Sequence, residues 1–172
     1  MKQIIIISGK QYSGKDTLAK ILLDKMPDFK RIGIGDAIKI EYGRKHNLTF
    51  DEIEKNKHLY RNDLIELGNL GRSIDPDYWL RIMADMDKII VPDIRMCHEV
   101  EYFKEKGAFA IRVNSDIQNR SKRGTIVNQN DNTETELDSY SDWDMVIENN
   151  SDIEALIKKA DIAIGFFREI MN

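Results

Sequence analysis

The first seventeen residues constrain the fold of this chain more than any other segment. The β-branched run Ile4–Ile7 leads into Ser8–Lys15, which reads SGKQYSGK, and a helical pattern follows. A Gly-x-x-x-x-Gly-Lys run between a strand and a helix is typical of a loop whose backbone N–H groups bind a phosphate chain. Gly9 and Gly14 allow the tight wrap, and Lys15 reaches the β- and γ-phosphate oxygens. The segment therefore predicts a nucleoside triphosphate site.

One position beside this loop departs from the usual pattern. Asp16 stands where Ser or Thr normally ligates Mg²⁺, and Thr17 follows one residue later. A carboxylate is also a ligand for this cation, either directly or through water. The sequence therefore predicts a Mg²⁺-bound triphosphate near Asp16 and Thr17, and it leaves open whether Asp16 contacts the metal directly.

Strand-like and helical segments alternate along the chain. Such alternation implies a mostly parallel sheet covered by helices on both faces, here within one α/β domain spanning 1–172. Two segments interrupt the order, a helical stretch at about 36–85 and a polar stretch at about 114–142. Strands are predicted at 3–8, 29–34, 87–92, 108–113 and 144–148, and helices at 17–26, 96–106 and from 151 onward.

Short patterns predict where two helices begin. Pro76 fits the first turn of a helix that carries Tyr78, Trp79 and Met83. Ser151 and Glu154 fit a capping box, in which each side chain satisfies a free backbone N–H of the last helix. The apolar stripe of that helix comprises Ile153, Leu156, Ile157, Ala160, Ile164, Phe167 and Met171.

The composition excludes several classes of protein. With 41% apolar and 33% charged residues, the chain can fill a core, which argues against a largely disordered protein. A net charge of -4 provides no global positive surface for a nucleic acid polymer, and a single cysteine, Cys97, excludes an internal disulfide framework. No purely apolar run exceeds four residues, against the ~20 that span a bilayer, and no secretory signal is visible. We therefore expect a cytoplasmic protein without a membrane partner.

Two residues that follow the third predicted strand suit phosphoryl transfer. Asp93 and Arg95 lie at the carboxyl edge, where open α/β sheets bind ligands. Asp93 is a candidate for organising Mg²⁺ or orienting an acceptor oxygen, and Arg95 for holding a phosphate through two N–H groups. A helix N-cap beside a surface arginine is the alternative interpretation.

The polar stretch at 114–142 contains a cluster of cations. Arg120, Lys122 and Arg123 precede Gly124, and no further Lys or Arg appears before Lys158. Cations on a mobile segment suit a lid that closes over transferring phosphates and excludes water. A solvated run of charges is the alternative.

Taken in order, these motifs resemble the P-loop nucleoside monophosphate kinase superfamily. Within it, the chain is similar to phage-type deoxynucleoside monophosphate kinases and to animal-type phosphomevalonate kinase, in which Asp after the loop lysine is typical. The resemblance covers nearly the whole chain. It is carried by residues 8–16, 36–39, 46–50, 60–61, 68, 72, 75–76, 93–95, 120–124, 133–134, 137–138 and 144–149.

The resemblance implies a three-layer α/β/α P-loop kinase fold with a five-stranded parallel sheet. It also implies a helical acceptor-binding insertion at about 36–85 and an Arg-bearing lid at about 114–142. ATP and Mg²⁺ are the implied cofactors, and a small phosphorylated molecule is the implied partner of a monomer or homodimer. Lys39, Arg61 and Arg72, each of which alone would be read as a surface charge, are placed at the acceptor by this resemblance.

The candidate site residues fall into overlapping groups. The catalytic candidates are Lys15, Asp93, Arg95, Arg120 and Arg123, and the metal candidates are Asp16 and Asp93. The cofactor-binding candidates are Gly9, Gly14, Lys15, Asp16, Thr17, Arg120 and Asn149, the last expected near the adenine. The substrate-binding candidates are Lys10, Tyr12, Lys39, Arg61, Arg72 and Arg95.

The leading functional hypothesis is transfer of the γ-phosphoryl group of ATP to the phosphate of a (deoxy)nucleoside monophosphate. The pattern of phosphomevalonate kinases has basic residues at positions that are occupied here by Gln11, Tyr12 and Met96. An aromatic and an apolar side chain at such positions suit a flat base. They fit simple packing equally well, so phosphomevalonate kinase is the alternative. A non-catalytic nucleotide-binding regulatory module is a further alternative, although no Asn-Lys-x-Asp run for guanine is present.

Overall fold

The structure, a computed structural model, describes residues 2–171. The chain divides into two compact units, which we call the sheet unit (2–31 and 87–171) and the helical unit (32–86). The insertion predicted at about 36–85 lies within the helical unit. Its role as an acceptor-binding element stays a prediction.

The sheet unit is built on five parallel strands, as predicted, and their order in the sheet is β2-β3-β1-β4-β5. The central strand β1 is paired on both sides, with Ile5 opposite Ile90 of β3 and Phe109 of β4. All its side chains are buried, which explains why its sequence is continuously apolar and does not alternate. The strands are β1 (Ile4–Ser8), β2 (Lys30–Arg31), β3 (Ile89–Ile94), β4 (Phe109–Asn114) and β5 (Met145–Glu148).

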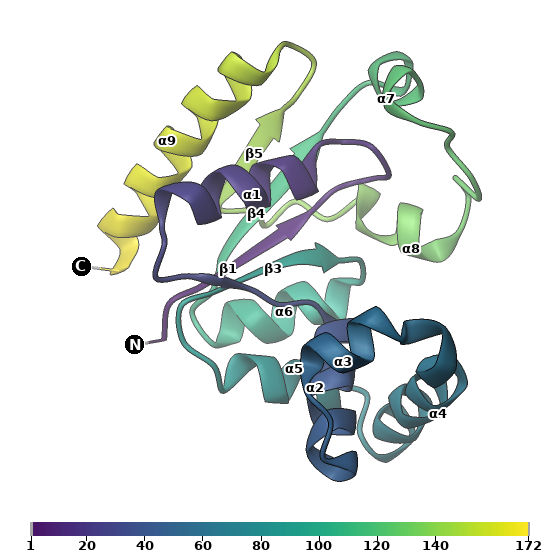
Figure 1. Cartoon of the computed structure of the whole chain (residues 1–172). Coiled ribbons are helices and arrows are strands. Elements are labelled where there is room, and N and C mark those ends of the chain that lie inside the picture. Colours follow the sequence, from purple (N-terminus) through teal and green to yellow (C-terminus); the bar gives the residue numbers. More distant parts are fainter. Residues whose placement is uncertain (1, 172) are drawn as a thin grey trace. The chain divides into compact units, whose positions relative to one another are not determined.

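Helices cover both faces of this sheet and give the three predicted layers (Figure 1). The helices α1 (Lys15–Lys25) and α9 (Ile153–Met171) lie on one face, and α6 (Cys97–Glu105) lies on the other. Leu22 of α1 and Phe167 of α9 join one apolar cluster with the sheet residue Phe109. The predicted stripe of the last helix therefore supplies much of the core, apart from Ile153, which is 47% exposed.

The segment between β4 and β5 contains α7 (Ile117–Arg123), α8 (Asn132–Thr135) and a 3-10 turn, Glu136–Asp138. The part of this segment that holds α7 and α8 lies beyond the carboxyl ends of the strands, and the chain then returns to the start of β5 (Figure 1). We refer to residues 114–142 as the lid segment, after the role predicted for them. The lid segment contacts the loop between β1 and α1.

The helical unit contains α2 (Ile34–His46), α3 (Phe50–Lys55), α4 (Lys57–Ile74) and α5 (Tyr78–Ala84). Trp79 of α5 is 2% exposed and donates a 3.0 Å hydrogen bond from Nε1 to the carbonyl oxygen of Gly68. Its ring passes so close to Gly71 that a Cβ there would lie 2.7 Å from the ring nitrogen. The glycines of α4 therefore allow its close contact with α5.

Several predicted boundaries are wrong by one or more residues. The helix α1 begins at Lys15, two residues before its predicted start at Thr17, because Gly14 adopts a left-handed conformation and serves as its N-cap. Ladder pairing extends β3 to Ile94, so Asp93 lies within the strand and not beyond it. The second strand is reduced to Lys30–Arg31, since the chain enters α2 soon afterward.

The two predicted helix starts are also shifted. The helix α5 begins at Tyr78 with Asp77 as N-cap, so Pro76 lies in the preceding turn and not in the helix. The helix α9 begins at Ile153, and the Asp152 carboxylate accepts a 2.9 Å hydrogen bond from the N–H of Ala155. Asp152 therefore takes the capping position predicted for Ser151.

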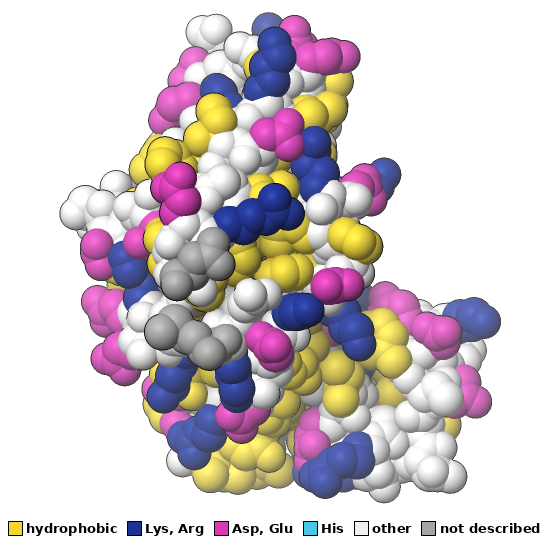
Figure 2. All heavy atoms as spheres, turned by 90° about the vertical axis from the view of Figure 1, so that its left-hand side faces the viewer, with side chains coloured by type: hydrophobic (Ala, Val, Ile, Leu, Met, Phe, Trp, Pro, Cys, Tyr) yellow, Lys and Arg dark blue, Asp and Glu magenta, His cyan; other side chains and the backbone are white. Residues whose placement is uncertain are grey.

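Lys and Arg side chains are interspersed with Asp and Glu on the face drawn in Figure 2. Apolar side chains are exposed between them, so this face has no extended field of one charge sign among the coloured residues. Within the described part of the chain, no helix is long and apolar enough to cross a membrane.

Candidate active site

The loop between β1 and α1 is closed by a short turn and by glycines that have no room for a side chain. The N–H of Ser13 donates to the carbonyl oxygen of Lys10 at 3.1 Å, and Gly14 has φ +101°. A Cβ on Gly9 would lie 2.4 Å from Ser13 Oγ and 2.6 Å from the carbonyl oxygen of Val113. The tight wrap predicted for this loop is therefore present and depends on glycine at both positions.

Lys15 is the first residue of α1 and is buried, with its residue 7% exposed. Its Nζ lies 3.7 Å from Asp16 Oδ2, too far for a strong hydrogen bond. Burial lowers the pKa of Lys15, against the opposing effect of Asp16. Because Asp16 compensates this buried ammonium group only weakly, the site favours the binding of an anion.

The surroundings of Lys15 fit a phosphate chain with a bound cation. A hollow of about 490 Å³ is lined by Gln11, Tyr12, Gly14, Lys15, Asp16, Thr17 and Arg123. Beside it, the buried Ser13 Oγ has no hydrogen-bond partner within the described residues. Asp16 and Thr17 offer the oxygen ligands that Mg²⁺ prefers, and Asp16 is 68% exposed. No group of three or more His, Cys, Asp and Glu side chains lies within metal-binding reach in residues 2–171.

Two predicted lid arginines contact the loop through its carbonyl groups. Arg120 is buried and donates from Nη1 to the carbonyl oxygen of Gln11 at 3.3 Å. Arg123 donates from Nη1 to the carbonyl oxygens of Tyr12 and Ser13, at 3.1 and 3.2 Å. It also donates from Nη2 to the carbonyl oxygen of Asn149 at 2.8 Å. The structure thus brings Arg120, Arg123 and Asn149 together at the loop.

Two substrate-binding candidates in the loop also contact the lid segment. Tyr12 has φ 59°, and its ring lies against Gly124, where a Cβ would approach Cε1 to 2.2 Å. Lys10 Nζ lies 2.6 Å from Asp138 Oδ2. Both residues belong to the sheet unit. Their present partners are the lid segment, and a role in binding substrate stays a prediction.

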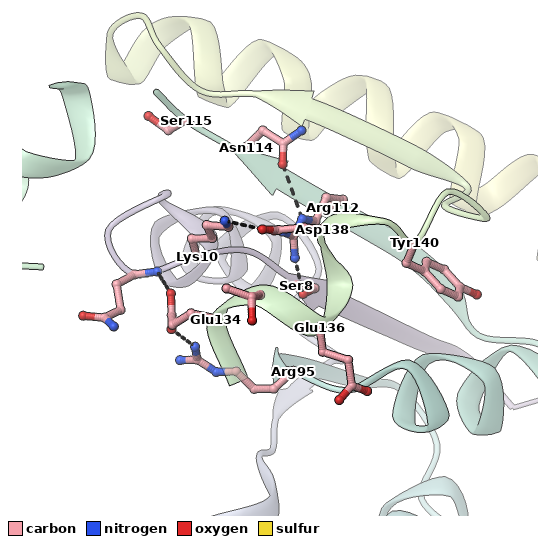
Figure 3. Close-up of polar contacts among 12 residues, drawn as sticks. Ser8, Lys10, Arg95, Arg112, Asn114, Ser115, Glu134, Glu136, Asp138 and Tyr140 are labelled. Atoms are coloured by element: carbon pink, nitrogen blue, oxygen red, sulfur yellow. Dashed lines mark hydrogen bonds and ion pairs between the residues drawn. The ribbon is translucent and has the colours of Figure 1, made fainter. Parts of the chain in front are cut away.

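A polar cluster beside the loop contains three residues to which the sequence assigned no role, Arg112, Glu134 and Asp138 (Figure 3). Glu134 accepts a 2.9 Å hydrogen bond from the N–H of Gln11 and pairs with the guanidinium of Arg95. Arg112 donates from Nη1 to Ser8 Oγ at 3.0 Å and from Nη2 to Asp138 Oδ1 at 3.4 Å. Burial lowers the pKa of Arg112, against the effect of Asp138. The available signals were an arginine inside the mostly apolar β4 and the inclusion of Glu134 and Asp138 among the residues that carry the family resemblance.

Asp93 and Arg95 have different structural settings. Arg95 follows β3 and faces Glu134, whereas Asp93 is a half-buried residue within β3. Asp93 does not line the hollow around Lys15. Its predicted role in metal or acceptor binding stays a prediction.

The remaining candidates, Lys39, Arg61 and Arg72, meet at one groove of the helical unit. This groove measures about 670 Å³ and is lined by Gly35, Ile38, Lys39, Lys57, His58, Arg61, Leu64, Ile65 and Arg72. Lys39 Nζ lies 2.5 Å from Glu54 Oε2 and 3.2 Å from Asp36 Oδ1. Burial opposes its charge, but the hydrogen bonds to Glu54 and Asp36 outweigh burial and raise the pKa of Lys39.

Comparisons with known proteins agree on a kinase fold. The solved structures that resemble the chain include shikimate kinases from Bacteroides thetaiotaomicron and Aquifex aeolicus, with TM-scores of 0.58 and 0.54. The first is 13% identical, with 98% of this chain and 99% of that chain covered. The second is 14% identical, with 95% and 96% covered. Likeness at this identity concerns the fold alone.

Sequence comparisons are more specific. A phosphomevalonate kinase of Drosophila melanogaster is 28% identical over 173 aligned positions, which cover 90% of this chain and 92% of the relative. The family model described as phosphomevalonate kinase matches residues 7–109, and the model described as deoxynucleotide monophosphate kinase matches residues 69–160. Each match spans more than half of the chain. The chain therefore belongs to the P-loop kinases that these two models describe, phosphomevalonate kinase and deoxynucleotide monophosphate kinase, and it is a phosphotransferase.

Proposed function

We propose that the protein transfers the γ-phosphoryl group of ATP to the phosphate of a small acceptor, giving a diphosphate and ADP. A (deoxy)nucleoside monophosphate is the acceptor that we place first. The observation that carries the proposal is the buried Lys15 in a glycine-walled loop, beside a hollow that Asp16, Thr17 and Arg123 also line. Backbone N–H groups and a lysine in this arrangement are suited to a triphosphate.

In this proposal, the protein contributes positioning and charge. Lys15 and the N-terminus of α1 hold the β- and γ-phosphates, while Arg95, Arg120 and Arg123 stabilise the charge that develops during transfer. Mg²⁺, when bound near Asp16 and Thr17, neutralises negative charge on the phosphates. Asp93 is retained as a candidate for orienting the acceptor oxygen. Phosphoryl transfer requires little else of the protein, because no covalent intermediate is needed.

The groove of the helical unit supports a nucleotide acceptor. Arg61 and Arg72 both belong to α4 and are eleven residues apart, which is about three turns and places them on one face. Between them the groove has an aliphatic floor that includes Ile38 and Leu64. A flat base suits an aliphatic floor, and a phosphate suits a guanidinium that can bind it through two N–H groups.

A second acceptor is supported by the number of cations on the same groove. Lys39, Lys57, Arg61 and Arg72 all line it. Four positive charges are more than a single phosphate group requires, and they suit a molecule that carries both a phosphate and a carboxylate. Mevalonate 5-phosphate is such a molecule, and the fruit fly relative bears the name phosphomevalonate kinase.

A coupled assay of ADP release distinguishes these acceptors. The enzyme is assayed with ATP, Mg²⁺ and each ribo- or deoxyribonucleoside monophosphate, and separately with mevalonate 5-phosphate, with ³¹P NMR to identify the diphosphate. Turnover with one or more monophosphates is the expected result. Turnover with mevalonate 5-phosphate alone replaces the first acceptor with the second. ATP binding without transfer to any acceptor refutes the proposal and favours a regulatory module.

A further inference from the structure

The carboxylate of Glu134 joins two parts of the sheet unit that are far apart in sequence (Figure 3). Its Oε2 accepts a hydrogen bond from the backbone N–H of Gln11, in the phosphate loop, at 2.9 Å. Its Oε1 pairs with Nη1 of Arg95, which follows β3. The side chain is 4% exposed, so both oxygens are used within the protein and not in water.

Because the Glu134 side chain is buried, its two bonds have a large effect on the energy of the folded protein. A buried carboxylate is costly unless it is paired and hydrogen-bonded, and the penalty for removing one partner is large. Arg95 and the Gln11 amide provide that compensation for Glu134. The position of the Arg95 guanidinium is therefore tied to the position of the loop through a single side chain.

The same carboxylate reduces a repulsion between two cations. The positive charge of Arg95 acts to lower the pKa of Lys15, and the negative charge of Glu134 acts to raise it. Glu134 therefore offsets part of the repulsion between the Arg95 and Lys15 side chains. Arg95 has five N–H groups, and its bond to Glu134 leaves others available for a phosphate.

A second carboxylate of the lid segment makes a weaker version of this contact. Asp138 lies 2.6 Å from Lys10 Nζ and 3.4 Å from Arg112 Nη2. Its side chain is 44% exposed, so water screens both pairs. Glu136, two residues away, accepts a 2.8 Å hydrogen bond from the N–H of Cys97 and does not contact the loop in the described contacts. Of these three carboxylates, Glu134 has the buried pairing that positioning requires.

We propose that Glu134 is a positioning residue that holds the Arg95 guanidinium against the phosphate loop before substrates bind. The inference rests on the proposed phosphotransfer, in which Arg95 binds a phosphate during the reaction. Glu134 does not itself contact a substrate. It acts through Arg95, and its bond to the backbone N–H of Gln11 anchors it to the loop.

The test is a double-mutant cycle on kcat with Glu134→Gln and Arg95→Ala. Gln has one oxygen and one NH₂ group, so it can keep one of the two bonds and loses the charge. We expect Glu134→Gln to lower kcat by about ten- to a hundredfold while the KM for ATP changes by less than about threefold. In the Arg95→Ala background, the same substitution is expected to change kcat by less than about twofold, because the group through which it acts is absent.

Controls separate positioning from folding. Glu136→Gln removes a comparable carboxylate from the same segment and is expected to leave kcat unchanged, while thermal unfolding is followed for every variant. If Glu134→Gln does not fold, Glu134→Asp retains the charge at a shorter reach and is expected to lower kcat by a smaller factor.

The outcomes distinguish this inference from the proposed function. Equal losses from Glu134→Gln with and without Arg95, or an unchanged kcat in a folded Glu134 variant, overturn the positioning role alone. A wild-type enzyme without turnover on any acceptor overturns both.

Discussion

The side chain of Asn149 donates a hydrogen bond of 2.8 Å from Nδ2 to the carbonyl oxygen of Ser13. This bond joins the residue after β5 to the phosphate loop, and the Arg123 guanidinium contacts both partners from the lid segment. Asn149 is buried, so the contact is shielded from water. The back of the loop is therefore held by two segments that lie more than a hundred residues further along the chain.

Gly14→Ala tests this packing. A Cβ at Gly14 would lie 2.1 Å from Asn149 Nδ2, and the φ of +101° is strained for any L side chain. We expect a loss of about 1–3 kcal/mol in the free energy of unfolding and a large loss of ATP affinity. Urea denaturation and calorimetric titration with ATP measure the two effects. Gly165→Ala in α9, where a Cβ meets nothing within 4 Å, is the matched control and is expected to be neutral or slightly stabilising.

Lys15→Ala tests the phosphate loop itself. We expect kcat to fall by about 100-fold or more, because the ammonium that we propose for the transferring phosphate is removed. Since burial lowers the pKa of Lys15, its removal is expected to leave the fold intact. Lys20→Ala, at an exposed position of the same helix, serves as the control. Full activity of Lys15→Ala in the ADP-release assay would contradict the assignment of the loop.

The phosphate loop was predictable because its signal is local. Glycine spacing, a preceding apolar strand and a following helix lie within seventeen residues, and the structure has all of them in order. The parallel character of the sheet also followed from the alternation of elements, whereas the strand order is known only from the structure. Such patterns depend on neighbours in sequence, which a single chain displays directly.

The roles of Glu134 and Arg112 depend on partners that are distant in sequence. Glu134 contacts Gln11 and Arg95, and nothing beside Glu134 in the polar stretch indicates either contact. The predicted end of β3 at residue 92 was wrong for a similar reason. The strand ends at Ile94, because Ile94 pairs with Ser8 of β1. Tertiary neighbours thus decide which charges are functional candidates and where a strand stops.

Arg72→Ala tests the acceptor groove. We expect the KM for the acceptor to rise by about tenfold or more, with little change in the KM for ATP, because the guanidinium that we propose for the acceptor phosphate is lost. Steady-state kinetics with each substrate varied in turn measure this split. Arg44→Ala removes an arginine of the same unit that pairs with Glu41 and does not line the groove, so both KM values are expected to stay unchanged. Equal increases in the two KM values would argue against an acceptor site on α4.

Glu54→Gln tests the pair that holds Lys39 at the groove. The hydrogen bond from Lys39 lowers the pKa of Glu54 below its ordinary value of 4.5, so the folded state favours the ionised carboxylate. The stability from this pair is therefore present above pH 4.5 and is lost as the pH falls through the lowered pKa. We expect wild type to have the higher urea midpoint at pH 7 and the difference from Glu54→Gln to shrink steadily below pH 4.5. A difference that stays constant as the solution is acidified would show that the Lys39–Glu54 contact does not stabilise the folded helical unit.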